Sequence, residues 1–306
     1  MRLLSWMPPS AATFIYSVCL KPKPVRAVAQ WLVKRIIPSR LTVDGIVLVM
    51  NQDDAIVCGA LTLGCYETFP RRLFRDLLKP GMTVVDVGAN IGLYTAIAAG
   101  RVGPAGRVIA VEPEGRNCRL IHQTLELNRF TNVEVVQAAV SDRTGPGQLF
   151  LNEENKAGHR IFDRGSSRAV VPVDFHRLDD LLAKLAVKRT DVVKMDIQGA
   201  EALALQGMRR TLTENAEIRL MIEYWPWGIA QAGGDPRSVL RSIRAMGFQI
   251  FKIDDHAVHG RPESDDDRMA SRGLERQHMN LLLQRSRDIP TGAGSRSASS
   301  RRSNED

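Results

Sequence analysis

The chain has 306 residues, 44% hydrophobic and 25% charged, which is enough for one or two globular domains with a full core. Seven Lys or Arg and no Asp or Glu precede Asp44, so the formal net charge of +8 leaves only +1 for the rest. That near-neutral body lacks the basic footprint of a nucleic-acid-binding protein. The four cysteines form no CxxC pair, which argues against a zinc site and favours reduced, free thiols.

Residues 1–41 form a basic N-terminal extension. Apolar residues recur at helical spacing over residues 25–37, which predicts an amphipathic helix bounded by Pro24 and Pro38. Two interpretations stay open: a helix docked on the domain behind it, or an interfacial anchor with peripheral membrane contact. No apolar run is long enough to span a bilayer, so we expect a cytoplasmic protein, either free or peripheral at a membrane surface.

Residues 42–80 form a lead-in module. The runs 46–50 and 55–58 flank the polar residues 51–54, which predicts a hairpin. A helix is expected over 69–78, ended by Pro80 and Gly81.

The segment 83–95 reads as a buried strand, a glycine-bearing turn and the start of a helix. Such a turn presents backbone N–H groups to a ligand. Glu112 ends the next apolar run, about 20 residues past the turn, where an acid accepts hydrogen bonds from ribose hydroxyls. The pattern therefore predicts a nucleoside site, with the candidate cofactor-binding residues Asp86, Gly88, Asn90, Gly92 and Glu112.

Further strands are expected over 133–136, 191–195, 218–224, 248–253 and 278–284, with helices between them. Residues 148–152 and 169–173 alternate like a hairpin around a polar loop, which either faces a substrate or is a surface insertion. Domain boundaries are placed at 81–285 for the main domain and 286–306 for a disordered tail.

A second motif, Lys-Met-Asp-Ile-Gln-Gly-Ala-Glu, spans residues 194–201. Together with DVGAN, GCYE, VEPEG, AAVSD and IEYWP, it resembles the FkbM-type S-adenosylmethionine-dependent methyltransferases over roughly residues 42–284. Gln198 stands where that family usually has Glu. The resemblance implies an α/β, Rossmann-like class I methyltransferase fold, with a seven-stranded, mostly parallel sheet and helices on both faces.

The resemblance also implies S-adenosyl-L-methionine as cofactor, Asp142 as the partner of its adenine amino group, and O-methylation of a sugar, glycan or natural-product hydroxyl. Asp196 is the candidate base and Lys194 its partner, with Glu201 and Glu223 in reserve. Asp196 with Glu223 could also hold a divalent metal, although no metal is predicted. The structural alternatives are a strand-end ion pair for Lys194 and Asp196, and a helix-start acid for Glu201.

Other functions stay open as alternatives. A nicotinamide-dependent oxidoreductase shares the fold but needs a G-x-G-x-x-G loop. An RNA or other nucleic-acid methyltransferase lacks support here, because no N-P-P-Y-like motif or Pro-Cys nucleophile is present. A non-catalytic binding protein on the same scaffold is the third. We expect a small-molecule or glycan acceptor and no nucleic acid.

Overall fold

The computed structural model describes residues 23–152, 158–162, 168–254, 256–259, 266–271 and 278–285. Residues 1–22 and the predicted tail, 286–306, lie outside these ranges.

A seven-stranded sheet forms the centre of the molecule, in the order β11-β12-β10-β9-β3-β4-β5. Six of these strands run in the same direction, and β12 runs opposite to them, between β11 and β10. This confirms the predicted α/β class and mostly parallel sheet. The strands are β3 (Thr83–Val87), β4 (Arg107–Val111), β5 (Val133–Val136), β9 (Val192–Met195), β10 (Arg219–Tyr224), β11 (Gln249–Ile253) and β12 (Met279–Gln284).

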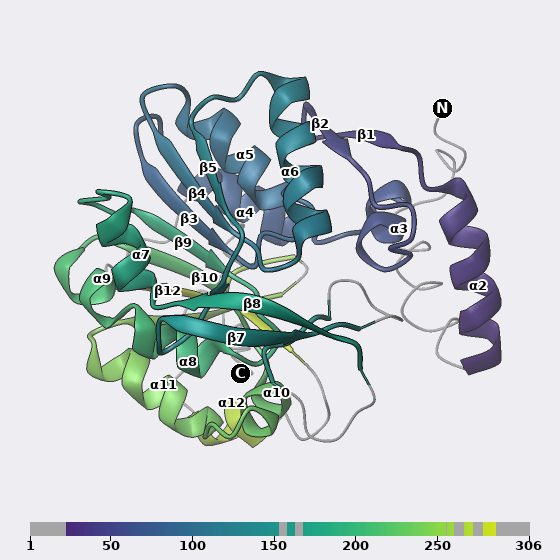
Figure 1. Ribbon diagram of the computed structural model, residues 1–306. Coiled ribbons are helices and arrows are strands. Elements are labelled where there is room, and N and C mark those ends of the chain that lie inside the picture. Colours follow the sequence, from purple (N-terminus) through teal and green to yellow (C-terminus); the bar gives the residue numbers. More distant parts are fainter. Residues whose placement is uncertain are drawn as a thin grey trace, which may run out of the picture.

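Two hydrophobic cores lie on opposite faces of this sheet, because successive strand residues point to opposite sides. Val85 and Val193 pack toward one helical layer, and Val84 and Val192 toward the other. The first layer contains α7 (Leu178–Lys184), α8 (Glu201–Gly207), α9 (Arg209–Glu214), α10 (Pro226–Gln231), α11 (Pro236–Ala245) and α12 (Asp266–Ser271). The second contains α4 (Thr68–Leu77) and α5 (Leu93–Val102) (Figure 1). Helix α6 (Gly115–Asn128) packs over β4 and β5, at that edge of the sheet.

The lead-in hairpin differs from the prediction. It pairs β1 (Arg40–Val43) with β2 (Ile46–Val49) through the Asp44-Gly45 turn, whose φ angles are 52° and 84°. The predicted second strand, 55–58, is wrong, since Val57–Thr62 forms helix α3. Asp54 Oδ1 accepts hydrogen bonds from the backbone N–H groups of Ile56 (2.9 Å) and Val57 (3.1 Å), which starts that helix.

A smaller sheet, in the order β6-β8-β7, lies beside the carboxyl ends of the central strands. Its strands are β6 (Ala139–Val140), β7 (Gly145–Phe150) and β8 (Val170–His176). The antiparallel pairing of β7 with β8 confirms the predicted hairpin. Between these strands, Arg160 lies next to the end of β7. Phe150 and Arg160 exchange two backbone hydrogen bonds of 2.7 and 3.1 Å.

The predicted amphipathic helix is present as α2 (Lys23–Ile36). It lies at the edge of the molecule and packs against α3 (Figure 1). Within the described part of the chain, none of the helices combines the length and apolar character needed to cross a membrane.

Candidate active site

The turn after β3 has left-handed backbone at three positions. Gly88, Asn90 and Gly92 have φ angles of 80°, 52° and 85°, which glycine adopts freely and asparagine more readily than most residues. A side chain on Gly88 is excluded for a second reason, since its Cβ would lie 2.0 Å from the carbonyl oxygen of Asp196. The loop after β3 and the end of β9 are thus in direct backbone contact.

Glu112 follows β4 and is fixed to this loop. Its Oε2 accepts a hydrogen bond from the backbone N–H of Asn90 (2.8 Å), and its Oε1 accepts from the backbone N–H of Glu114 (3.0 Å) and from Asn117 Nδ2 (3.2 Å). Burial raises the pKa of Glu112 to about 7, against the opposing effect of these hydrogen bonds. The carboxylate is therefore held rigidly and is easily protonated.

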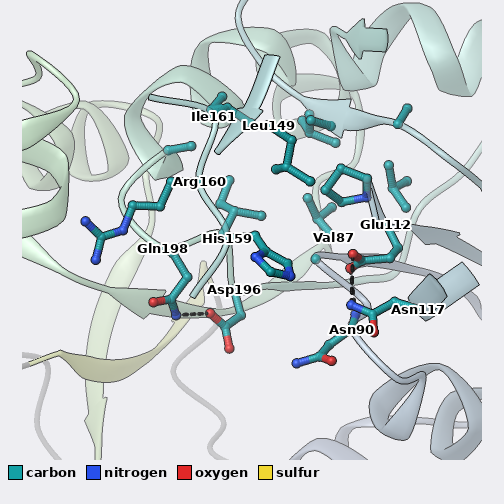
Figure 2. Close-up of a pocket in the computed structure, with 18 residues that line it drawn as sticks. Val87, Asn90, Glu112, Asn117, Leu149, His159, Arg160, Ile161, Asp196 and Gln198 are labelled. Carbon is teal, nitrogen blue, oxygen red and sulfur yellow. Dashed lines mark hydrogen bonds between the residues drawn. The ribbon is translucent and has the colours of Figure 1, made fainter. Parts of the chain in front are cut away.

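A pocket lies between this loop, the end of β9 and the smaller sheet. Four predicted site residues line it: Gly88, Asn90, Glu112 and Asp196. Apolar side chains such as Val111, Leu149 and Ile161 supply much of its wall. Figure 2 shows Asn90 and Glu112 on one side and Asp196 on the other. Apolar walls with a few converging polar groups are typical of small-molecule sites.

The other predicted residues do not line this pocket. Gly92 is the N-cap of α5. Asp142 is exposed, and its Oδ1 accepts a hydrogen bond of 3.1 Å from Ser141 Oγ. The adenine contact expected of Asp142 therefore stays a prediction.

Asp86 lies buried beneath the loop. Its Oδ2 accepts a hydrogen bond of 2.6 Å from Thr95 Oγ1 in α5. Burial raises the pKa of Asp86 to about 6, opposed by this hydrogen bond and by nearby Lys194. The position suits a residue that joins β3 to α5 and stabilises the loop from below.

Lys194 and Asp196 mark the end of β9. The Lys194 ammonium is buried, 3.9 Å from Asp196 Oδ2 and 4.8 Å from the centre of the Tyr94 ring. Burial alone would lower the pKa of Lys194, but the surrounding carboxylates, Asp196 first, raise it above its usual value. Burial likewise opposes ionisation of Asp196, yet Lys194 brings the pKa of that carboxyl below its usual value. At neutral pH this is a charged pair with an ionised carboxylate in the pocket.

Glu223, in β10, is joined to Asp196 by Gln198. The Gln198 Nε2 donates to Asp196 Oδ1 (3.0 Å) and to Glu223 Oε2 (2.7 Å). Burial and the adjacent Asp196 raise the pKa of Glu223 well above its usual value, so Glu223 takes up a proton before Asp196 does. His278 Nε2 lies 3.6 Å from Glu223 Oε1. Among the described residues, no three His, Cys, Asp or Glu side chains are arranged to hold a metal ion.

Glu201 is fully buried at the start of α8. Its Oε1 accepts a hydrogen bond of 3.0 Å from the backbone N–H of Gly199, while Oε2 has no hydrogen-bond partner in the described part of the chain. Burial raises the pKa of Glu201 to about 8. A buried, neutral carboxyl outside the pocket fits the structural alternative better than a catalytic role.

Glu67 and Tyr94 lie near the Lys194 ammonium without lining the pocket, and neither was among the predicted site residues. The Tyr94 hydroxyl donates to Glu67 Oε2 (2.8 Å), and Asn280 Nδ2 donates to Glu67 Oε1 (3.4 Å). Glu67 has a φ of 41°, strained for a non-glycine residue, and contributes to the raised pKa of Lys194. The only sequence signal for Glu67 is its place in the GCYE segment.

The loop between β7 and β8 contributes His159 and Arg160 to the pocket wall. The Arg160 guanidinium lies 4.5 Å from the ring centre of Trp225 and 5.6 Å from that of Trp227. This cation–π contact ties the loop to the start of α10. Of the two interpretations of the loop, the structure favours the one in which it faces a ligand.

Residues 86–250 match the model of the methyltransferase FkbM domain, which is more than half of the chain. The chain belongs to this family. It is 27% identical over 208 residues to "Methyltransferase 1" of Beauveria bassiana, covering 61% of this chain and 77% of that protein. It is 27% identical to the 2-O-methyltransferase NoeI of Sinorhizobium fredii, covering 48% and 66%.

Among solved structures, the chain resembles methyltransferase FkbM from Methylobacillus flagellatus, with 18% identity, a TM-score of 0.42, and coverage of 85% of this chain and 59% of that one. The family match over residues 86–250 identifies the protein as a methyltransferase of the FkbM type, and the residues that line the pocket lie inside the matched region.

Proposed function

We propose that this FkbM-type protein transfers the methyl group of S-adenosyl-L-methionine to a hydroxyl oxygen of a sugar, glycan or natural product. The observation that carries this proposal is the position of the Asp196 carboxylate, which lies 3.9 Å from the Lys194 ammonium and lines the same pocket as Glu112. An alcohol is a weak nucleophile that must lose a proton, so a positioned carboxylate is what this acceptor requires.

The residues present fit the cofactor. Gly88 has no side chain that would fill the pocket. Glu112 Oε1 already accepts two hydrogen bonds and Oε2 accepts one, so Oε2 has an acceptor site left for a ribose hydroxyl. When bound, S-adenosyl-L-methionine supplies an electrophilic methyl group. Gly88, Asn90 and Glu112 would hold its nucleoside end.

The two neighbouring carboxyls, Asp196 and Glu223, have different roles in this proposal. Asp196 accepts the proton of the acceptor hydroxyl, and Lys194 keeps Asp196 ionised beforehand. Glu223, whose pKa is raised, is the carboxyl that keeps a proton more readily, and Gln198 holds both side chains in place. An amide at position 198, where the family usually has Glu, adds no third carboxyl to Asp196 and Glu223, so it is compatible with these roles.

Support for a hydroxyl acceptor comes from NoeI, whose name describes methylation at a 2-oxygen. The near-neutral charge of the chain after residue 43 gives no support to an RNA acceptor.

The test is to incubate the full chain with methyl-labelled S-adenosyl-L-methionine and, separately, glycans, glycolipids, polyketide alcohols and RNA. We expect label in a hydroxyl-bearing acceptor, as an alkali-stable methyl ether, and its loss with Asp196→Asn but not with the exposed control Glu126→Gln. Label in RNA, or in an amine or carboxylate, would refute the proposal.

A further inference from the structure

The helix α2 is held on the protein by one side only. Ile37, just past its end, is 2% exposed and belongs to the core shared with β3 and α5. Val33 packs against α3 so closely that a Cβ on Gly59 would lie 2.5 Å from Val33 Cγ1. The carbonyl of Ile37 also accepts a hydrogen bond of 3.1 Å from Gln52 Nε2. These contacts fix which side of α2 faces outward.

The outward side of α2 carries four large apolar side chains. Val28, Trp31, Leu32 and Ile36 are exposed by 61%, 53%, 53% and 40%, and their spacing places them on one helical stripe. They are four of the six large apolar side chains that are exposed in the described part of the chain. Contiguous exposed apolar surface of this kind marks an interaction site.

Two cations lie on the same outward side. Lys34 and Arg35 are exposed, and the Arg35 guanidinium lies 4.1 Å from the centre of the Trp31 ring. No acidic residue occurs before Asp44, although seven Lys or Arg do. An outward helix side that carries Trp, Leu and cations, without an acid, suits the surface of an anionic bilayer.

We propose that α2 docks the protein on anionic phospholipid membranes. Val28, Trp31, Leu32 and Ile36 enter the headgroup boundary, while Lys34 and Arg35 meet lipid phosphates. A second copy of the chain fits this surface less well than an anionic membrane does. Pairing two copies through α2 would bring the same cations together, with no acid on either helix to neutralise them. The inference does not depend on the proposed reaction, since membrane binding needs no turnover.

The test is flotation of the full chain with vesicles of phosphatidylcholine alone and of phosphatidylcholine with phosphatidylglycerol. We expect the wild type to float with the anionic vesicles only. The double variant Trp31→Ser with Leu32→Ser should bind these vesicles at least tenfold more weakly. Lys34→Gln with Arg35→Gln should weaken it about 25-fold at low salt, at about fivefold per cation. The control is Leu127→Ser, which removes a 38% exposed leucine on α6 and should change nothing.

Several outcomes would overturn the proposal: no flotation of the wild type, equal flotation with neutral vesicles, or equal losses in the Leu127 control. A dimer in sedimentation that the Trp31 and Leu32 changes dissociate, without vesicle binding, would identify α2 as a self-association surface instead. Melting curves of each variant check that the fold is intact, so a loss of binding can be assigned to the helix surface.

Discussion

Glu112 Oε2 accepts a hydrogen bond of 2.8 Å from the backbone N–H of Asn90, so the acid after one strand organises the loop after the neighbouring strand. A substitution of Glu112 therefore removes the proposed ribose ligand and also a support of the loop. Glutamine keeps one of the two acceptor oxygens and loses the charge, so it should disturb both less than alanine does.

We predict that Glu112→Ala weakens S-adenosyl-L-methionine binding by about 2–3 kcal/mol, roughly 30- to 150-fold, and that Glu112→Gln weakens it less. Isothermal calorimetry measures both, with Glu126→Ala, an exposed change on α6, as control. Unchanged affinity in a folded Glu112→Ala protein would rule out the ribose assignment.

The pH dependence of cofactor binding follows from the same residue. Because the pKa of Glu112 is raised to about 7, its acceptor form is lost as the pH falls through 7. Affinity in the wild type should thus decrease from pH 8 to pH 6, whereas Glu112→Gln should vary much less over this range. Parallel pH curves for the two proteins would show that Glu112 does not titrate there.

Gly88 and Gly81 offer a matched pair, since both have a φ of 80°. Around Gly81 nothing lies within 4 Å of a Cβ, but at Gly88 a Cβ meets the Asp196 carbonyl oxygen at 2.0 Å. Gly81→Ala should cost only the left-handed backbone penalty, about 1–2 kcal/mol of stability. Gly88→Ala should cost clearly more and weaken cofactor binding. Equal shifts in urea unfolding midpoints would contradict the contact between loop and strand.

Asp196→Asn preserves the shape of the side chain and an oxygen for the Gln198 hydrogen bond, but removes the base. We expect kcat to fall by about 10²- to 10⁴-fold, the usual contribution of a general base, with cofactor affinity within a few-fold of the wild type. Rapid-quench turnover and calorimetry give the two numbers. Near-normal kcat would move the base to another carboxyl, with Glu223 next; loss of folding would make Asp196 structural.

Glu201 should influence stability more than turnover. Its folded-state pKa of about 8 exceeds the ordinary value of 4.5, so the folded protein keeps a proton that the unfolded chain releases between these values. This contribution to the free energy of unfolding is present below about pH 4.5 and is lost as the pH rises toward 8. The Tm of Glu201→Gln should therefore fall less between pH 6 and 9 than that of the wild type.

The control for this comparison is Glu214→Gln, an exposed change on α9, whose curve should parallel the wild type. If Glu201→Gln also runs parallel and loses turnover, Glu201 is ionised and belongs to the catalytic machinery.

The central sheet could be predicted because its strands are short apolar runs between turn residues, as in Val84–Val85 and Val192–Val193, buried on both faces. The prediction of a strand at 55–58 was wrong because a short apolar segment is compatible with a strand and with a helix. The stronger hairpin signal is Asp44-Gly45, which suits two positive φ angles. The helical segment after β9 divides at Met208 into α8 and α9. It does so just after Gly207, where an added Cβ would lie 2.0 Å from the Ser141 carbonyl oxygen.

The sequence could predict that Glu112 and Asp196 line one pocket, because each follows a parallel strand and the carboxyl ends of such strands meet at one edge of the sheet. The bridge from Gln198 to Glu223 depends on rotamers, and the approach of Glu67 to Tyr94 depends on how α4 packs on α5. Neither follows from spacing in the sequence.

The position of β12, between β11 and β10, means that the central sheet is completed only when the last described strand has been synthesised. Among the described strands, β11 pairs only with β12, and β12 also pairs with β10, so a strand made late joins two made earlier. The same segment brings Asn280 to Glu67 and His278 to Glu223. A nascent chain that ends before residue 278 lacks both of these partners, so the surroundings of Glu67 and Glu223 are completed only after the β3 loop and Glu112 have been synthesised.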